Sequence, residues 1–168
     1  GISKFDALDA FLLAKHLNIQ IFTVKEIFKD NYEHPGYSIL TNPSKFNAMW
    51  MPACDGNKII IHNDCHSLYR QQSNLMHELS HIIEGHEIPS KAAQLCHEFN
   101  LHYFNPVHEE EAKYLGGCLQ ITREGLSQAL RMGLTKEEIS KLFSASIDMV
   151  NYRMNATGVM RQLNYRFK

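Results

Sequence analysis

The hydrophobic pattern of this 168-residue chain predicts several short helices and one small sheet. Three runs rich in β-branched and aromatic residues, at 18–24, 45–51 and 57–63, predict strands. Asp55-Gly56 lies between the last two runs and predicts a hairpin turn. Apolar residues spaced three and four apart predict helices at 6–17, 67–83, 89–104, 107–121, 122–132, 136–143 and 147–155.

Residue types that begin and end helices support these boundaries. Asp6 is expected to cap the first helix, and the turn-rich residues 29–38 are expected to form a loop. Gly85 is expected to end the helix at 67–83, because glycine takes the left-handed conformation at little cost. Further start signals are Asn105 followed by Pro106, and the capping box of Thr135 and Glu138.

These elements predict an α+β fold in one compact unit, since a chain of this length can bury one core. We expect a small antiparallel hairpin sheet to pack on the helix at 67–83. Residues 1–122 would form the main core, and residues 123–168 would form a helical subdomain packed on it. The helices at 136–143 and 147–155, joined by a short Ser-Ala-Ser turn, are similar to a helix-turn-helix segment.

The composition is that of a globular protein without membrane spans. Apolar residues make up 44% and charged residues 21% of the chain, and its apolar runs fall far short of the roughly 20 residues that cross a bilayer. Residues 1–25 lack the basic start and cleavage site of a secretory signal. Four cysteines without a C-x-x-C spacing then predict free thiols and a cytoplasmic protein. Because the chain starts at Gly1, an upstream segment is expected to be missing.

The run NLMHELSHIIEGHE at 74–87 contains the strongest chemical signal in the sequence. His77 and His81 lie four residues apart on the predicted helix, so both imidazoles can reach one metal ion. Glu78 would lie beside that ion, which is where a general base for a water molecule is needed. An ordinary amphipathic helix explains the same letters, because the leucines and isoleucines of the run supply a core face either way. The H-E-x-x-H spacing favours zinc over that explanation.

A catalytic zinc ion usually has three protein ligands, so a third ligand must be found. His86 lies about 140° around an ideal helix from His81, and we expect it to cap the helix or to contact a ligand residue. Glu84 and Glu87 are poor ligand candidates on similar grounds, although Glu84 could orient a ligand histidine. The remaining candidates are three successive glutamates on a later helix: Glu109, Glu110 and Glu111. A solvated acidic face near a helix N-terminus is the alternative explanation for these three.

In the order of its motifs, the chain resembles the ImmA/IrrE family of zinc metallopeptidases. The resemblance is carried by LDAFLLAKHLNIQIF, NKIIIHN, Arg70-Gln71 ahead of LMHELSHIIEGH, EEEAKYLGGCL and GLTKEEISKLFSASIDMVNYRM, between about residues 8 and 156. It implies a zincin-like core, Zn²⁺ as the cofactor and Glu109 as the third ligand, with Glu111 and Ala112 following in register.

The second family motif has the form E-x-E-A-(N/D)-x-F-A-A-x-L-L-M-P, and this chain departs from it at several positions. Lys113 replaces the Asn or Asp that often contacts a ligand histidine, so the ligands are kept while a partner that tunes one of them is lost. The other replacements are Leu115 for Phe, Gly116-Gly117 for two alanines, and Gln120-Ile121-Thr122 for the Leu-Met-Pro ending.

The resemblance implies an endopeptidase whose substrate is a helix-turn-helix repressor, often encoded by a neighbouring gene. Glu78 would take a proton from water and pass it to the leaving amine. Tyr103, His108 and Tyr114 lie near the second motif and are candidate donors to the oxyanion. The strand at 58–62 is expected to pair with an extended substrate.

Two binding functions are the alternatives. Residues 123–168 contain eight Lys/Arg and four Asp/Glu, although the whole chain has a net charge of −1. A DNA-binding regulator with a non-catalytic zinc ion would use the basic side chains of this segment on phosphates: Arg153, Arg161, Arg166 and Lys168. A module that holds a metal ion and binds a protein without cutting it is the other alternative. Exchanging Glu78 for Gln separates a peptidase from such a module.

Overall fold

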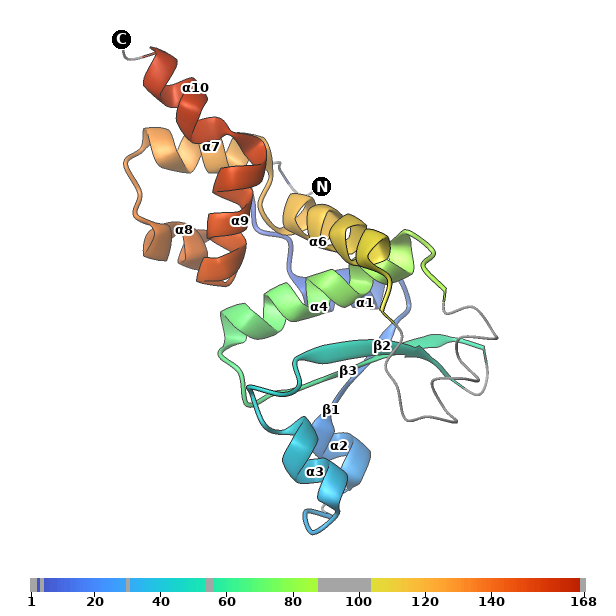
Figure 1. The fold of residues 1–168 in the computed structure, drawn as a ribbon. Helices are drawn as coiled ribbons and strands as arrows, with labels where there is room; N and C mark the ends of the chain where they lie inside the picture. The colour runs from blue at the N-terminus through green and yellow to red at the C-terminus, as the bar shows by residue number, and fades with distance from the viewer. Residues whose placement is uncertain (1–2, 4, 30, 54–55, 88–103, 167–168) are drawn as a thin grey trace.

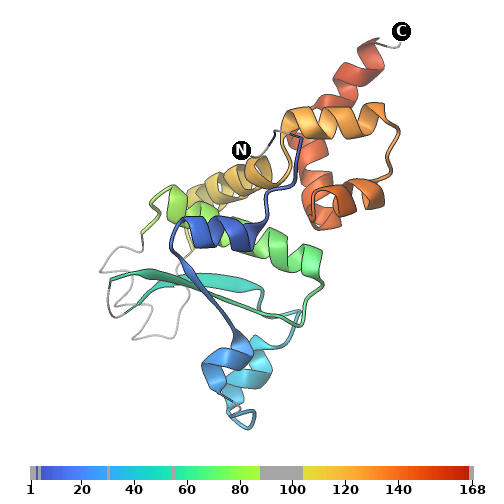
Figure 2. The ribbon, with the colours of Figure 1, turned by 180° about the vertical axis from the view of Figure 1, so that it is seen from behind.

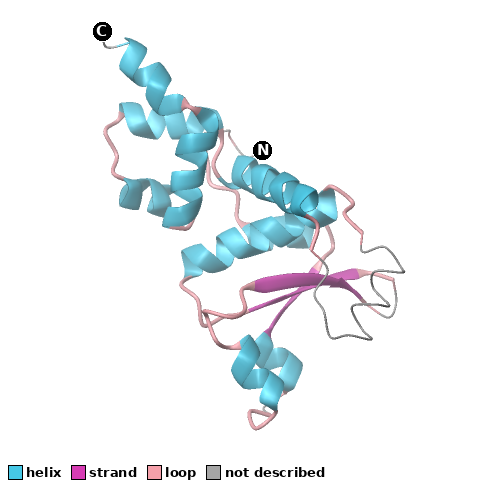
Figure 3. Cartoon of the chain, viewed as in Figure 1, coloured by secondary structure: helices cyan, strands magenta, loops and turns pink. Residues whose placement is uncertain are grey.

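A small sheet lies against one face of a helix pair, and further helices cover the opposite side of that pair (Figures 1 and 3). This arrangement is seen in a computed structural model that describes residues 3, 5–29, 31–53, 56–87 and 104–166. Helices α1 (Ala10–His16) and α4 (Leu68–Ile83) lie side by side above the sheet, and α6 (Pro106–Gln120) packs on α4 from the other side (Figures 1 and 2). The predicted α+β class is confirmed.

The sheet has three strands in the order β1-β3-β2. Strand β3 (Lys58–His62) is central, with β2 (Ala48–Pro52) antiparallel to it and β1 (Gln20–Thr23) parallel to it. The predicted sheet of antiparallel strands is therefore wrong in one respect. The chain enters β2 after two helices, and the β2–β3 hairpin then reverses it, so that β3 runs in the same direction as β1. The proposal that residues 58–62 pair with a substrate is also wrong, since β3 has a partner on each side.

The β2–β3 hairpin forms as predicted. Ala53 donates its backbone N–H to the Asn57 carbonyl over 2.7 Å, and Gly56 has a φ of +83°, which a residue with a side chain rarely adopts. Asp55 of the predicted turn lies outside the described residues. The apolar run of β3 is explained by its central place, because Ile60, Ile61 and His62 are buried.

The N-cap of helix α1 lies three residues later than predicted. Asp9 is its N-cap and accepts a hydrogen bond from the Leu12 N–H over 2.9 Å, whereas the Asp6 carboxylate accepts from the Ser3 N–H. Both aspartates are good caps, and Asp9 is selected because its other oxygen accepts a hydrogen bond from the side-chain amide of Gln72 on α4.

Two short helices, α2 (Val24–Phe28) and α3 (Pro35–Leu40), lie beyond one end of the sheet (Figure 1). Thr23 and Glu26 form a capping box that starts α2 where a strand was predicted to continue. Helix α3 occupies part of the predicted loop at 29–38, with Pro35 at its start. A proline that reads as a turn signal thus begins a helix here.

The starts and ends of the longer helices agree with the sequence signals. Gly85 follows α4 with a φ of +70°. Asn105 caps α6, and Pro106 is its first residue. The predicted helix at 89–104 lies outside the described residues. No helix in the described part of the chain is long and apolar enough to cross a membrane.

Four helices follow α6: α7 (Arg123–Arg131), α8 (Lys136–Leu142), α9 (Ile147–Thr157) and α10 (Val159–Arg166). They share one buried cluster, formed by Ile121, Leu126, Ala129, Ile139, Phe143, Ala145, Val150 and Val159. A second cluster joins α1, α4 and the sheet, through Ala10, Ala14, Ile60, Leu75, Met76 and Leu79. The capping box of Thr135 and Glu138 is confirmed, while the proposed domain boundary at residue 122 stays a prediction.

Buried polar contacts dock the corner between α8 and α9 onto α4 and α6. Ser73 on α4 donates to the Gln120 side-chain oxygen and accepts from the Ser146 N–H, each over 2.9 Å. Gln120 in turn donates to the Ser144 carbonyl over 2.9 Å. The helix-turn-helix-like corner therefore packs its turn against the rest of the protein.

Cysteine thiols are free where the structure describes them. Cys65 is exposed, Cys118 is half-buried, and neither forms a disulfide. Cys54 and Cys96 lie outside the described residues. The prediction of free thiols is confirmed for Cys65 and Cys118.

Candidate metal centre

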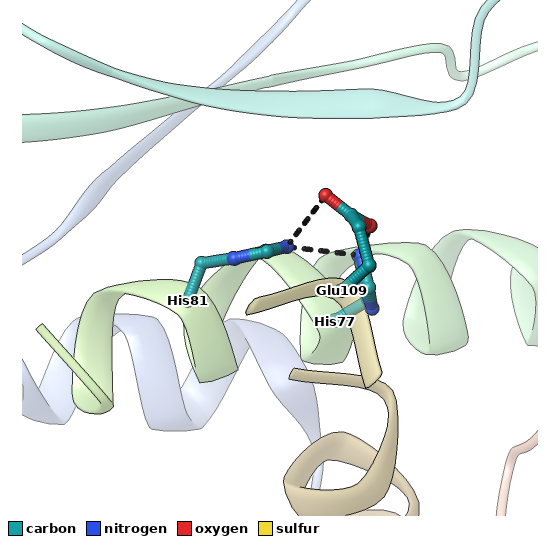
Figure 4. Close-up of side chains that lie close together, drawn as sticks. All are labelled: His77, His81 and Glu109. Carbon is teal, nitrogen blue, oxygen red and sulfur yellow. Dashed lines mark hydrogen bonds and ion pairs between the residues drawn. The ribbon is translucent and has the colours of Figure 1, made fainter. Parts of the chain in front are cut away.

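Three side chains from two helices converge at one point (Figure 4). His77 Nε2 lies 3.1 Å from His81 Nε2 and 3.2 Å from Glu109 Oε2, and His81 Nε2 lies 3.6 Å from Glu109 Oε1. The ligand atoms of these three side chains all lie within 4.8 Å of one another, so the trio could hold one metal ion. Among the described residues, no other group of His, Cys, Asp or Glu side chains meets this criterion. The structure thus brings together the three residues that the sequence and the family resemblance named as ligands.

Helices α6 and α4 approach each other closely at Gly116. A Cβ atom built on Gly116 would lie 3.1 Å from Ser80 Oγ and 3.2 Å from the Met76 carbonyl oxygen, and it would also contact the backbone of His77. A side chain at this position would therefore require its neighbours on α4 to shift by a few tenths of an ångström. Gly116 thus lies at a close contact between α6, which carries Glu109, and α4, which carries the two histidines.

The donor set fits a zinc ion. Burial lowers the pKa of both His77 and His81, and the His77 ring lowers that of His81 further, while the Glu109 charge opposes both shifts. Both rings are therefore neutral near pH 7. Two ligand atoms bound to a tetrahedral zinc ion lie about 3.3 Å apart, which matches the separations in this group. Two nitrogens and a carboxylate oxygen also form a common ligand set of catalytic zinc. The His77 and Glu109 side chains keep 27% and 35% of their surface exposed, so the site is open to a substrate.

A hydrogen-bonded chain supports His81 from behind. His81 Nδ1 lies 2.9 Å from His86 Nδ1, and His86 Nε2 lies 3.1 Å from Glu111 Oε2. If His81 directs the lone pair of Nε2 at the ion, its Nδ1–H donates to His86, and His86 donates its Nε2–H to Glu111. His86 thus contacts a candidate ligand, as the sequence predicted. The sequence had suggested Glu111 only as an alternative ligand. Its contact with His86 joins residues 25 positions apart, and sequence spacing does not predict such a contact.

We expect Glu111→Gln to weaken zinc binding without removing it. The amide cannot accept the His86 proton as strongly as a carboxylate does, so His81 becomes a less basic ligand. Loss of such an outer partner costs about 10- to 100-fold in metal affinity, and the half-exposed Glu111 should lie near the lower end of that range. Competition against a chromogenic chelator measures the change. Glu110→Gln is the matched control, and equal affinities of the two variants would contradict the prediction.

Glu78 lies between the trio and the edge of the sheet. Its Oε2 accepts a hydrogen bond from the Trp50 backbone N–H on β2 over 3.0 Å. Burial and, to a smaller extent, the Glu109 charge raise the pKa of Glu78 to about 8, although the hydrogen bond from the Trp50 N–H partly opposes them. This carboxyl group is not part of the metal trio, as expected of a base that acts beside the ion.

The raised pKa of Glu78 predicts a pH-dependent gain in stability for Glu78→Gln in metal-free protein. Between its ordinary pKa of 4.5 and its folded pKa of about 8, the unfolded chain binds fewer protons at this group than the folded chain does. Stability from this group is therefore lost as the pH rises through that interval. Glutamine removes the penalty, so the free energy of unfolding should rise by about 1–3 kcal/mol at about pH 9 and change little at about pH 5.

Urea unfolding of both proteins in the presence of a chelator measures this difference at the two pH values. Glu84→Gln, an exposed position just beyond α4, is the control for loss of one negative charge. A gain at pH 9 that persisted unchanged at pH 5 would show that ionisation of Glu78 is not its cause.

The candidate oxyanion donors are only partly placed. Tyr114 is 58% exposed and lines a cavity between α6 and α9, so it faces away from the metal centre and is not such a donor. The His108 ring stacks on His86 with 4.2 Å between the ring centres. Tyr103 lies outside the described residues. Lys113, the departure from the family motif, places its ammonium 4.7 Å from the centre of the Tyr152 ring and lowers the pKa of His77.

Comparison with known proteins identifies the family. Searches of curated proteins and of solved structures gave no match. The family model described as the IrrE N-terminal-like domain matches residues 14–155, which include α4, α6 and all three side chains of the metal trio. Because this match covers most of the chain, the protein belongs to the ImmA/IrrE family, and this membership implies a metallopeptidase.

Proposed function

We propose that this chain is a zinc-dependent endopeptidase and that its substrate is a helix-turn-helix repressor in the cytoplasm. His77, His81 and Glu109 would hold the ion. When bound, zinc supplies Lewis acidity, which polarises a peptide carbonyl and makes water more acidic. The observation that carries the proposal is the position of Glu78, which lies beside the trio and is tied to the backbone of an edge strand.

Strand β2 can position an extended peptide next to Glu78. It pairs with β3 on one side, and no strand pairs with its other edge among the described residues. Trp50 turns its N–H away from β3 and toward Glu78, so its carbonyl and the N–H and carbonyl of Ala48 also lie on that free edge. Peptides add to such edges through backbone hydrogen bonds. The edge thus takes the substrate role that the sequence had suggested for residues 58–62.

Glu78 would perform the proton transfers. As a carboxylate it accepts a proton from the attacking water, and as a carboxylic acid it returns that proton to the nitrogen of the leaving amine. The pKa of about 8 belongs to the protein without a metal ion, and a nearby dication would favour the carboxylate form. The Trp50 N–H keeps the carboxyl group oriented toward the free edge of β2.

The DNA-binding alternative finds less support in the geometry. A helix-turn-helix protein reads bases with the first turns of its second helix. Here the start of that helix is docked on α4, because the Ser146 N–H donates to Ser73. Arg153 is 97% buried and so cannot contact a phosphate backbone. Lys168 lies outside the described residues.

Cleavage of repressors tests the proposal. The protein is loaded with one equivalent of zinc and incubated with helix-turn-helix repressors from the same genome, and intact mass spectrometry reads the fragments. We expect one repressor to be cut at one bond, with no cleavage by the chelator-treated protein or of an unrelated unfolded protein. If the zinc-loaded protein leaves every repressor intact, the proposed substrate is wrong. If it cuts none of these proteins and binds no zinc, the peptidase assignment fails as well.

A further inference from the structure

A cavity of about 480 Å³ lies between α6, α7 and α9, on the part of α6 farther along the chain from Glu109. Its wall includes the ring of Tyr114, the thiol-bearing Cys118 and three charged side chains: Arg123, Glu124 and Arg153. None of these residues belongs to the metal trio or contacts Glu78. The size of the cavity is in the range of small-molecule sites.

Arg153 is the unusual member of this wall, because its charge is buried and no carboxylate within the described residues pairs with it. Its side chain is 97% buried, and Gly117 makes room for it, since a Cβ atom there would lie 2.7 Å from Arg153 Cδ. The Nε–H donates to the Ile121 carbonyl over 2.9 Å, and the guanidinium lies 6.0 Å from the centre of the Tyr114 ring. In the described part of the chain it forms no ion pair, even with Glu124 in the same wall.

One role of Arg153 is structural, but this role uses only part of its guanidinium group. By bonding the Ile121 carbonyl, Arg153 places positive charge at the C-terminal end of α6, where the helix dipole favours it. That contact uses one of five guanidinium N–H groups. Burying the rest without a negative partner is costly, and Arg153 lines the cavity, where an anion could meet them.

We propose that this cavity binds a small oxyanion, either a carboxylate or a phosphate group, on the guanidinium of Arg153. The planar fork of N–H donors matches two oxygens of either group. Arg123 brings a second positive charge to the wall, and it is the first residue of α7, whose N-terminal end also favours an anion. Glu124 opposes binding, but two arginines against one glutamate leave the wall positive.

Protection of Cys118 from alkylation tests the proposal directly. The full chain is titrated with inorganic phosphate or with acetate at constant ionic strength, and iodoacetamide labelling is followed peptide by peptide. We expect either anion to slow labelling of Cys118 in a saturable manner and to leave the exposed Cys65 unaffected. Protection by phosphate alone identifies a phosphate ligand, protection by acetate alone identifies a carboxylate ligand, and protection by neither overturns the proposal.

Charge variants in the wall give effects of opposite sign. Arg123→Gln should weaken the protecting anion by about two- to fivefold, and Glu124→Gln should strengthen it by a similar factor, because both side chains are exposed. Arg153→Lys keeps the charge and loses the fork, so about a tenfold weakening is expected. Arg131→Gln, at the other end of α7 and outside this cavity, is the matched control.

Thermal unfolding of each variant without anion shows whether it is folded. Should Arg153→Lys fail to fold, the opposed pair at positions 123 and 124 still decides the question. Equal protection in all four variants would place the anion elsewhere and overturn the proposal. Neither readout depends on zinc or on peptidase activity, so the cavity can fail this test while the proposed function stands.

Discussion

Exchanging Glu78 for Gln is expected to abolish turnover while leaving the zinc ion in place. Gln keeps the size of the side chain and an oxygen that accepts the Trp50 N–H, but it cannot take a proton from water. General acid–base catalysis contributes about 10²- to 10⁴-fold to the rate, so kcat on a cleaved repressor should fall by that factor. Zinc per chain should stay unchanged, because Glu78 lies outside the metal trio.

Single-turnover cleavage together with metal analysis by mass spectrometry measures both quantities on the same samples. Glu84→Gln is the control, since it removes an equal charge from an exposed position six residues away. It should keep both zinc and turnover. If Glu78→Gln cleaved as fast as the wild type, another residue would be the base, and if it lost its zinc, the loss of activity would say nothing about proton transfer.

The ends of helices could be predicted where one local contact decides them. Three such predictions hold, and each depends on residues within one helical turn. They are the capping box of Thr135 and Glu138, the start of α6 at Asn105 and Pro106, and the end of α4 at Gly85. The start of α1 could not be predicted, because two aspartates compete for the cap.

A long-range contact decides between the two aspartates. Asp9 caps α1 and also accepts from Gln72, which lies 63 residues further along the chain. In α1, Ala10 and Ala14 are buried, whereas Phe11 and Leu12 are exposed. The parallel pairing of β1 with β3 also joins distant parts of the chain, since Gln20 pairs with Ile59.

In the candidate site, too, residues could be predicted where local spacing identifies them and not where distant contacts do. His77, Glu78 and His81 belong to one helical face, so their spacing is sufficient to identify them. Glu109 required the second motif, because nothing in the local pattern separates it from Glu110 and Glu111. The hydrogen bond from the Trp50 N–H to Glu78 could not be predicted, because almost every residue has a backbone N–H and the residue type does not show which one donates.

The side chains that hydrogen-bond to the candidate ligand histidines also differ from those that the family motif suggests. The motif has Asn or Asp where this chain has Lys113, and a lysine cannot accept the proton of an imidazole. Lys113 instead lies over the ring of Tyr152 on α9. The carboxylate that completes a hydrogen-bonded chain is Glu111, and it reaches His81 through His86. The hydrogen-bonded chain therefore supports His81, which is more buried than His77.

Removing Glu109 is expected to empty the metal centre. Glu109→Ala leaves two neutral imidazoles on one helix, and a catalytic zinc ion usually needs three protein ligands. The loss should exceed the roughly 10- to 100-fold cost of removing an outer partner, so zinc should fall well below one per chain after dialysis against a weak chelator. Glu110→Ala, one residue further along the same helix and exposed, is the matched control and should keep its zinc.

The two variants separate the ligand explanation from the acidic-face explanation of this glutamate run. If the glutamates only complement the N-terminal end of α6, both alanine variants lose one favourable charge and behave alike. If Glu109 is a ligand, the two variants differ in zinc content, because Glu110 is not part of the metal trio. Zinc binding equal to wild type in Glu109→Ala would exclude the two-histidine, one-glutamate centre and with it the proton-transfer role that Glu78 has beside it.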